Sequence, residues 1–110
     1  MITKKDSLLL LDVPESLIRD FKVLCIGRDI SITKAINKTI AAAIEFPNKF
    51  EQTIKVKPLE DDNKKKWLLE GLDQHNKLKF KALCTKHKIT MKDAIIKIIS
   101  HYIREHAHEL

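Results

Sequence analysis

The amino-acid sequence contains two copies of one pattern, placed 59 residues apart. The segment Phe21–Glu45 aligns without a gap on the segment Phe80–Arg104, with 10 identical residues at 25 positions. The identities include apolar residues that mark one face of each predicted helix. Such a repeat indicates a supersecondary unit that occurs twice and buries its apolar face against its own copy. In a chain of 110 residues, the two copies have room for one shared hydrophobic core.

The first copy, residues 1–46, predicts one strand and two helices. Pro14 cannot donate a hydrogen bond within a sheet but fits the first turn of a helix, so it marks the change from strand to helix. Beyond it, apolar residues recur every three or four positions, which is the spacing of a helix that buries one face. Ser31 is a preferred N-cap residue and begins a second apolar stripe. We therefore expect a strand over residues 7–13 and helices over residues 14–28 and 32–46.

The second copy, residues 67–110, has the same plan, with one strand and two helices expected over residues 67–72, 74–86 and 91–106. The segment between the copies, residues 47–66, is polar and charged and is predicted to be a linker. Within it, residues 53–57 alternate polar and apolar side chains, which is a strand pattern of its own. The gapless alignment favours residues 67–72 as the second strand, because it places them opposite the first strand. An extra strand at residues 53–57 is left as the alternative.

Composition narrows the class of protein. The chain carries 21 basic and 15 acidic residues, a net charge of +6, and its pI is near 9.4. This basic balance suits a polyanionic partner. Cys25 and Cys84 occupy equivalent positions on apolar helix faces, which predicts small buried side chains in a reduced, cytoplasmic protein. The apolar runs are too short for a membrane span, so no membrane partner is expected.

The sequence predicts neither an enzyme nor a metal or cofactor site. It contains no phosphate-binding loop, nucleophile elbow or paired-carboxylate motif, and only two glycines with which to build tight catalytic loops. His101, His106 and His108 are close together near the C-terminus, but none of them forms the i, i+4 pair of a helical metal site, so we expect a polar tail there. No catalytic residue, metal or cofactor is therefore assigned.

A strand followed by two helices, joined by the turn Asp29–Ile36 (DISITKAI), resembles the ribbon-helix-helix family of MetJ-like and Arc-like DNA-binding proteins. In the second copy, residues 72–74, 80–84 and 89–91 are similar to the C-terminal domain of ParG-type plasmid partition regulators. Family members ordinarily dimerise by pairing one strand from each chain. Two units in one chain, as in TraY-type relaxosome proteins, imply a tandem ribbon-helix-helix fold. That fold is mainly α with a short two-stranded antiparallel β-ribbon, and it forms an intramolecular pseudo-dimer.

The resemblance implies a protein that binds double-stranded DNA as a single chain, as a transcriptional regulator, a plasmid partition factor or a relaxosome accessory factor. In the family, the ribbon enters the major groove and the N-termini of the second helices contact flanking phosphates. Lysines just ahead of each strand are expected to add phosphate contacts. The implied phosphate-contacting residues are Lys4, Lys5, Ser31, Thr33, Lys34, Lys64, Lys65, Lys66, Thr90 and Lys92. The chain is expected to act as a monomer, with a higher oligomer left open.

The outward face of the ribbon leads to a second hypothesis. Side chains alternate along a strand, so placing Val13 and Leu72 in the core turns six residues outwards: Leu8, Leu10, Asp12, Trp67, Leu69 and Gly71. Apolar groups contact thymine methyls but do not form the paired hydrogen bonds that discriminate bases. The alternative is therefore a protein-interaction module with the same fold, in which the four large apolar side chains of this set bind a protein partner. A third alternative is an all-helical bundle resembling tandem helix-turn-helix units.

Overall fold

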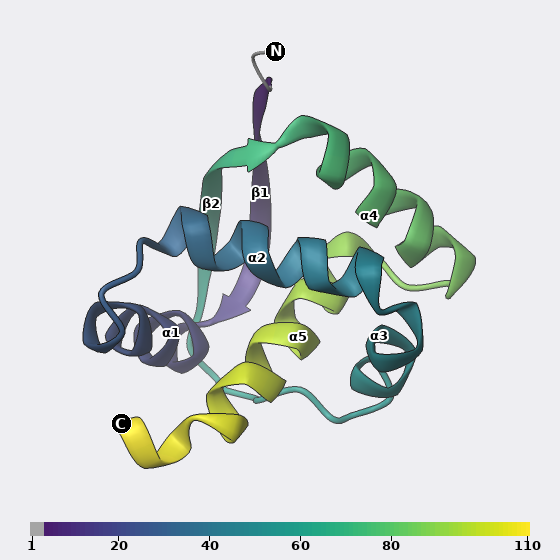
Figure 1. Ribbon diagram of the computed structural model, residues 1–110. Helices are drawn as coiled ribbons and strands as arrows, with labels where there is room; N and C mark the ends of the chain where they lie inside the picture. The colour runs from purple at the N-terminus through teal and green to yellow at the C-terminus, as the bar shows by residue number, and fades with distance from the viewer. Residues whose placement is uncertain (1–3) are drawn as a thin grey trace.

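The structure is a computed structural model that describes residues 4–110 (Figure 1). Over these residues the chain is mainly helical, with five α-helices and one two-stranded antiparallel sheet, so the predicted class is confirmed at this level. In chain order the elements are β1 (Lys5–Pro14), α1 (Glu15–Gly27), α2 (Ile32–Glu45), α3 (Pro47–Thr53), β2 (Lys64–Asp73), α4 (Gln74–Lys86), α5 (Met91–Glu105) and a 3-10 turn (Ala107–Glu109).

The backbone repeats with the same 59-residue spacing as the sequence. β1 and β2, α1 and α4, and α2 and α5 each begin 59 residues apart. The turn between the helices repeats as well, because Asp29 and Lys88 both adopt positive φ angles, of 52° and 56°. Ser31 and Thr90 then cap α2 and α5, each accepting a hydrogen bond from the backbone N–H three residues further on. These four helices begin and end within one residue of the predicted bounds.

Elements of the two copies pack against each other throughout one core. β1 pairs with β2 along its length, from Lys5 opposite Asp73 to Pro14 opposite Lys64. The two strands lie side by side behind α2 in Figure 1. Each long helix packs against a helix of the other copy, α1 against α5 and α2 against α4. Buried apolar residues from both copies form a single cluster, so neither copy buries its apolar face without the other.

One place in the core departs from the repeat and is completed by α3. Phe21 packs edge to face against Tyr102, with ring centroids 5.7 Å apart. The residue equivalent to Tyr102 in the first copy is Ala43, whose methyl group is too small to fill the matching space. Phe50 of α3 packs instead against Phe80, the equivalent of Phe21, at 5.8 Å and in the same edge-to-face geometry. Because Phe50 is only 2% exposed, α3 is part of the core.

Residues 47–66 differ from the predicted simple linker. The segment begins with helix α3, and its last three residues belong to β2, so both strands are longer than predicted. Residues 53–57 do not form a strand, because Thr53 ends α3 and Ile54 uses its apolar side chain to pack against the core from the following turn. Two side chains of α5 hold this turn and the residues after it: Lys97 donates a hydrogen bond to the Ile54 carbonyl and Arg104 donates one to the Lys57 carbonyl. The connection is therefore fastened to the body of the protein.

Two β-bulges decide which side chains of the ribbon face the core. The register of pairing shifts twice, and each shift coincides with a residue of positive φ: Asp12 (55°) on β1 and Gly71 (72°) on β2, again 59 residues apart. A bulge adds one residue to one strand and so reverses the alternation of faces beyond it. Apolar side chains on both sides of each bulge therefore point inwards, namely Leu10, Val13, Leu69 and Leu72.

Candidate nucleic-acid interface

The outward face of the ribbon has three leucines at its centre. Leu9 and Leu68 are directly opposed on the paired strands and are 53% and 50% exposed. Leu11, two positions further along β1, is 47% exposed. Apart from Leu11, the residues two positions along the strands from Leu9 and Leu68 are exposed and polar, namely Ser7, Lys66 and Glu70. The face is thus apolar at its centre and polar or charged around it.

The predicted outward face is wrong in its large apolar members. Leu8 is only partly exposed, and three others are at most 7% exposed: Leu10, Trp67 and Leu69. Asp12 is exposed and Gly71 is partly buried. The prediction assumed that side chains alternate between the two faces without interruption along each strand, starting from Val13 and Leu72. The two bulges reverse this alternation, so the faces are exchanged beyond each of them. A protein-binding surface built on Trp67 is therefore ruled out.

The lysines predicted to contact phosphates lie at both ends of the ribbon. Because the strands are antiparallel, Lys4 and Lys5 lie at one end and residues 64–66 at the other. All five side chains are exposed. A strand of ten residues separates the two groups by about 30 Å. Lys65 also forms an ion pair with Glu15 across 3.2 Å. Positive charge therefore flanks the apolar centre on both sides.

The first turns of α2 are attached to β2. The Thr33 hydroxyl donates a hydrogen bond to the Glu70 carbonyl at 3.1 Å. The Asn37 side chain donates to the Gly71 carbonyl and accepts from the Asp73 N–H, each at 3.0 Å. These bonds pair backbone groups of β2 with side chains of α2. They also place the N-terminus of α2 beside the ribbon.

Helix α5 packs against β1. Buried Ile96 takes the position that Asn37 has in the first copy, so this contact is apolar. Helix α2 is thus bonded to β2 near its N-terminus, and α5 packs against the other strand, β1. Of the residues predicted to contact phosphates there, Lys92 is partly buried, and the others are exposed: Ser31, Thr33, Lys34 and Thr90.

Two carboxylates that sequence reasoning missed hold the ends of the ribbon. Lys77 donates a hydrogen bond to Asp6 at 3.0 Å, and this bond is the main reason that the pKa of Asp6 lies below its ordinary value. Asp61 accepts hydrogen bonds from the N–H groups of Asn63 and Ser16, which lower its pKa. The second contact caps α1, whose N-cap residue, a proline, has no side-chain acceptor. A missing cap was the available sequence signal, but it does not name the partner.

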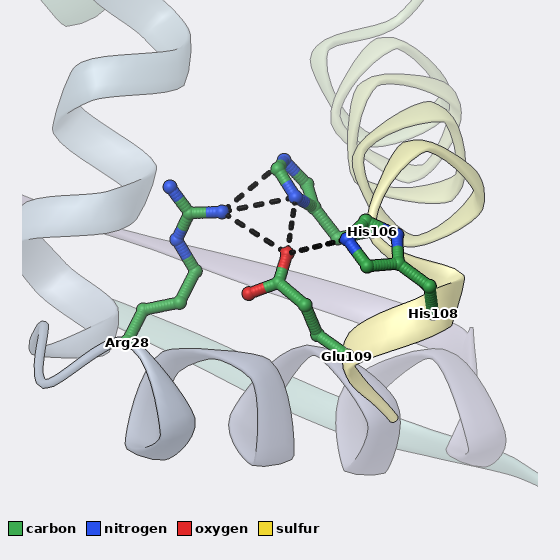
Figure 2. Close-up of polar contacts among 4 residues, drawn as sticks. All are labelled: Arg28, His106, His108 and Glu109. Atoms are coloured by element: carbon green, nitrogen blue, oxygen red, sulfur yellow. Dashed lines mark hydrogen bonds and ion pairs between the residues drawn. The ribbon is translucent and has the colours of Figure 1, made fainter.

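Two of the three C-terminal histidines, His106 and His108, belong to a cluster of polar contacts with Glu109 and Arg28, rather than to the predicted free polar tail. Figure 2 shows the Glu109 carboxylate in contact with Arg28, His106 and His108, and Arg28 in direct contact with His106. Its Oε2 atom lies 2.6 Å from Nδ1 of His106 and 3.4 Å from Nη1 of Arg28, with Nε2 of His108 at 3.9 Å. The Arg28 guanidinium also lies over the Tyr102 ring, 5.8 Å from its centroid. These contacts tie the C-terminal turn to the end of α1.

No family model matches the chain, and no curated protein or solved structure shows a significant similarity to it. None of the helices within residues 4–110 is long and apolar enough to cross a membrane. In the same part of the chain, no group of three or more His, Cys, Asp or Glu side chains is arranged to hold a metal ion. The ribbon and the helices beside it are therefore the features of the molecule that point to a function.

Proposed function

We propose that the chain is a DNA-binding protein of the ribbon-helix-helix type, in which the two copies form the dimer within one polypeptide. In this proposal β1 and β2 enter the major groove together, since a groove about 12 Å wide admits a two-stranded ribbon. The protein acts by binding, without catalysis, as a transcriptional regulator, a partition factor or a relaxosome accessory factor. The observation that carries the proposal is an exposed two-stranded ribbon with lysines at both ends.

The charges suit the path of the DNA backbone. The two lysine groups are separated by about 30 Å, close to the length of about 34 Å of one helical turn of DNA. The N-termini of α2 and α5 add unpaired backbone N–H groups and the positive end of the helix dipole on either side of the ribbon. The cap residues of these two helices, Ser31 and Thr90, are both exposed to solvent. Phosphate contacts of this kind supply affinity and orientation, whereas the ribbon supplies any sequence preference.

The test is the salt dependence of binding to a labelled duplex of about 25 base pairs, measured by fluorescence anisotropy between about 50 and 200 mM salt. We expect the double variant Lys64→Ala/Lys66→Ala to bind more weakly, and the slope of log K against log salt to fall by about one for each lysine that contacts a phosphate. The matched control is Lys81→Ala/Lys86→Ala, which removes the same charge from exposed positions of α4.

Two results would contradict the proposal. The first is the absence of duplex binding at about 50 mM salt, where phosphate contacts are strongest. The second is an equal loss of affinity in the ribbon and α4 variants, which would show that only the net charge of the chain matters. Circular dichroism of each variant establishes that the helices are retained.

A further inference from the structure

We infer that the ribbon recognises thymine methyl groups at the centre of its DNA site through Leu9, Leu11 and Leu68, and that the site is not palindromic. The inference rests on the proposed function, because it concerns what the outward face of the ribbon contacts in the major groove. It assigns a reading role to side chains that are neither basic nor amide-bearing.

The position of the three leucines carries the first part. Leu9 and Leu68 face each other across the strand pair, Leu11 follows on the same face, and each is between 47% and 53% exposed. The bulges at Asp12 and Gly71 enforce this exposure, since they turn the neighbouring leucines inwards. Large apolar side chains grouped at the middle of an exposed face indicate a contact surface.

The chemistry of the groove identifies the contact. A leucine side chain neither donates nor accepts a hydrogen bond, so it cannot read the polar groups of the base edges. The apolar group that a base pair presents in the major groove is the C5 methyl of thymine. Against a G·C pair, each leucine would remove water from polar atoms without an apolar contact in return, which costs binding free energy. The centre of the ribbon therefore favours A·T pairs with their methyl groups under the leucines.

The residues beside the leucines carry the second part. At one end of the outward face lie Ser7 and Glu70, and at the other end lie Leu11 and Lys66. A carboxylate accepts a hydrogen bond from the cytosine amino group, whereas a lysine donates to guanine. The two ends thus present different donors and acceptors, although the backbone repeats. One chain therefore binds its site in one orientation, with unlike flanks on either side of the A·T centre.

The experiment selects binding sequences from a random duplex pool with the full chain, and then replaces single thymines of the selected site by deoxyuridine. Deoxyuridine pairs like thymine and lacks only the methyl group. We expect a non-palindromic consensus with A·T pairs at its centre. Each central replacement should weaken binding about fourfold, the effect of one methyl group removed from an apolar contact. Replacements in the flanking duplex should leave the affinity unchanged.

A matched pair of variants assigns the effect to the ribbon. Leu68→Asn should remove the effect of deoxyuridine at the thymine that Leu68 contacts, whereas the thymines under Leu9 and Leu11 should keep theirs. Leu78→Asn should keep the sensitivity, because Leu78 is 61% exposed on α4, away from the strand pair. Circular dichroism confirms that both variants keep their helices.

The outcomes separate this inference from the proposed function. A consensus with G·C pairs at the centre, a palindromic consensus, or no effect of deoxyuridine overturns the inference and leaves DNA binding in place. If Leu68→Asn instead converts a dimeric chain into a monomer without altering DNA binding, the leucines contact a second copy and the inference fails. If the pool yields no bound duplex, the proposed function fails together with it.

Discussion

Replacement of Phe50 by alanine tests whether α3 is part of the core or only a connection. Phe50 lies outside both copies of the repeat, yet it is 2% exposed and packs edge to face against Phe80 and His87, with centroid distances of 5.8 and 5.5 Å. If this ring replaces the one that Tyr102 supplies to the other half, Phe50→Ala leaves a cavity beside Phe80. We therefore expect a large loss of stability from a residue that the repeat does not include.

The magnitude follows from the burial. Truncating a fully buried phenylalanine to alanine costs about 3 to 5 kcal/mol, which combines the lost transfer free energy with the cavity that remains. We expect about 3 kcal/mol for Phe50→Ala, at the lower end of this range, because a short surface helix can relax part of the way into the space. At about 4 °C for each kcal/mol in a domain of this size, the melting temperature should fall by about 12 °C.

Urea unfolding followed by circular dichroism, together with thermal melts, gives the free energy of unfolding and the melting temperature. The control is Phe46→Ala in the residue just ahead of α3, which is 49% exposed and should cost less than about 1 kcal/mol. A loss below about 1 kcal/mol for Phe50→Ala would show that α3 does not complete the core. The same conclusion would follow if the two variants were equally destabilised.

Two further predictions concern the backbone of the ribbon and its dependence on pH. Gly71→Ala should lower stability by about 1 to 3 kcal/mol in urea unfolding, because the residue has a φ of 72° and an added Cβ would lie 2.9 Å from Cγ2 of Thr33. Asp12→Gly at the equivalent bulge should change stability by less than about 0.5 kcal/mol, and equal effects of the two variants would contradict the bulge assignment. The lowered pKa of Asp61 means that its carboxylate stabilises the fold above the ordinary pKa of 3.8 and that this contribution is lost as the pH falls through the lowered value. Melts of the native chain and Asp61→Asn should therefore differ at about pH 6 and converge near about pH 2; a difference independent of pH would contradict this.

The helices and the repeat were determined by the sequence alone. The apolar stripe of a helix follows from the spacing of its own residues, and it does not depend on how the helix is attached to its neighbours. The 59-residue spacing then transferred each assignment from one copy to the other. For this reason the four long helices lie within one residue of their predicted bounds.

The buried and exposed faces of the ribbon could not be predicted in this way, because side chains along a strand change face at every residue. One inserted residue exchanges the buried and exposed faces, so an error at a single bulge misplaces every side chain beyond it. Gly71 was a sequence signal for such a bulge, whereas Asp12 was not recognisable in advance. The predicted outward face therefore contained Leu10, Trp67 and Leu69, which the structure buries.

Only the tertiary structure decided how the differences between the copies are compensated. Ala43 leaves space beside Phe80, and Phe50 enters it from the connecting segment. Pro14 has no side-chain acceptor to cap α1. Asp61 caps the helix instead, by accepting a hydrogen bond from the N–H of Ser16, 45 residues away in the sequence. Such contacts join residues that share no local pattern, because a cavity or an unpaired N–H arises only when separate elements meet. The sequence thus determined the repeated parts of the molecule, and packing determined where the two copies had to differ.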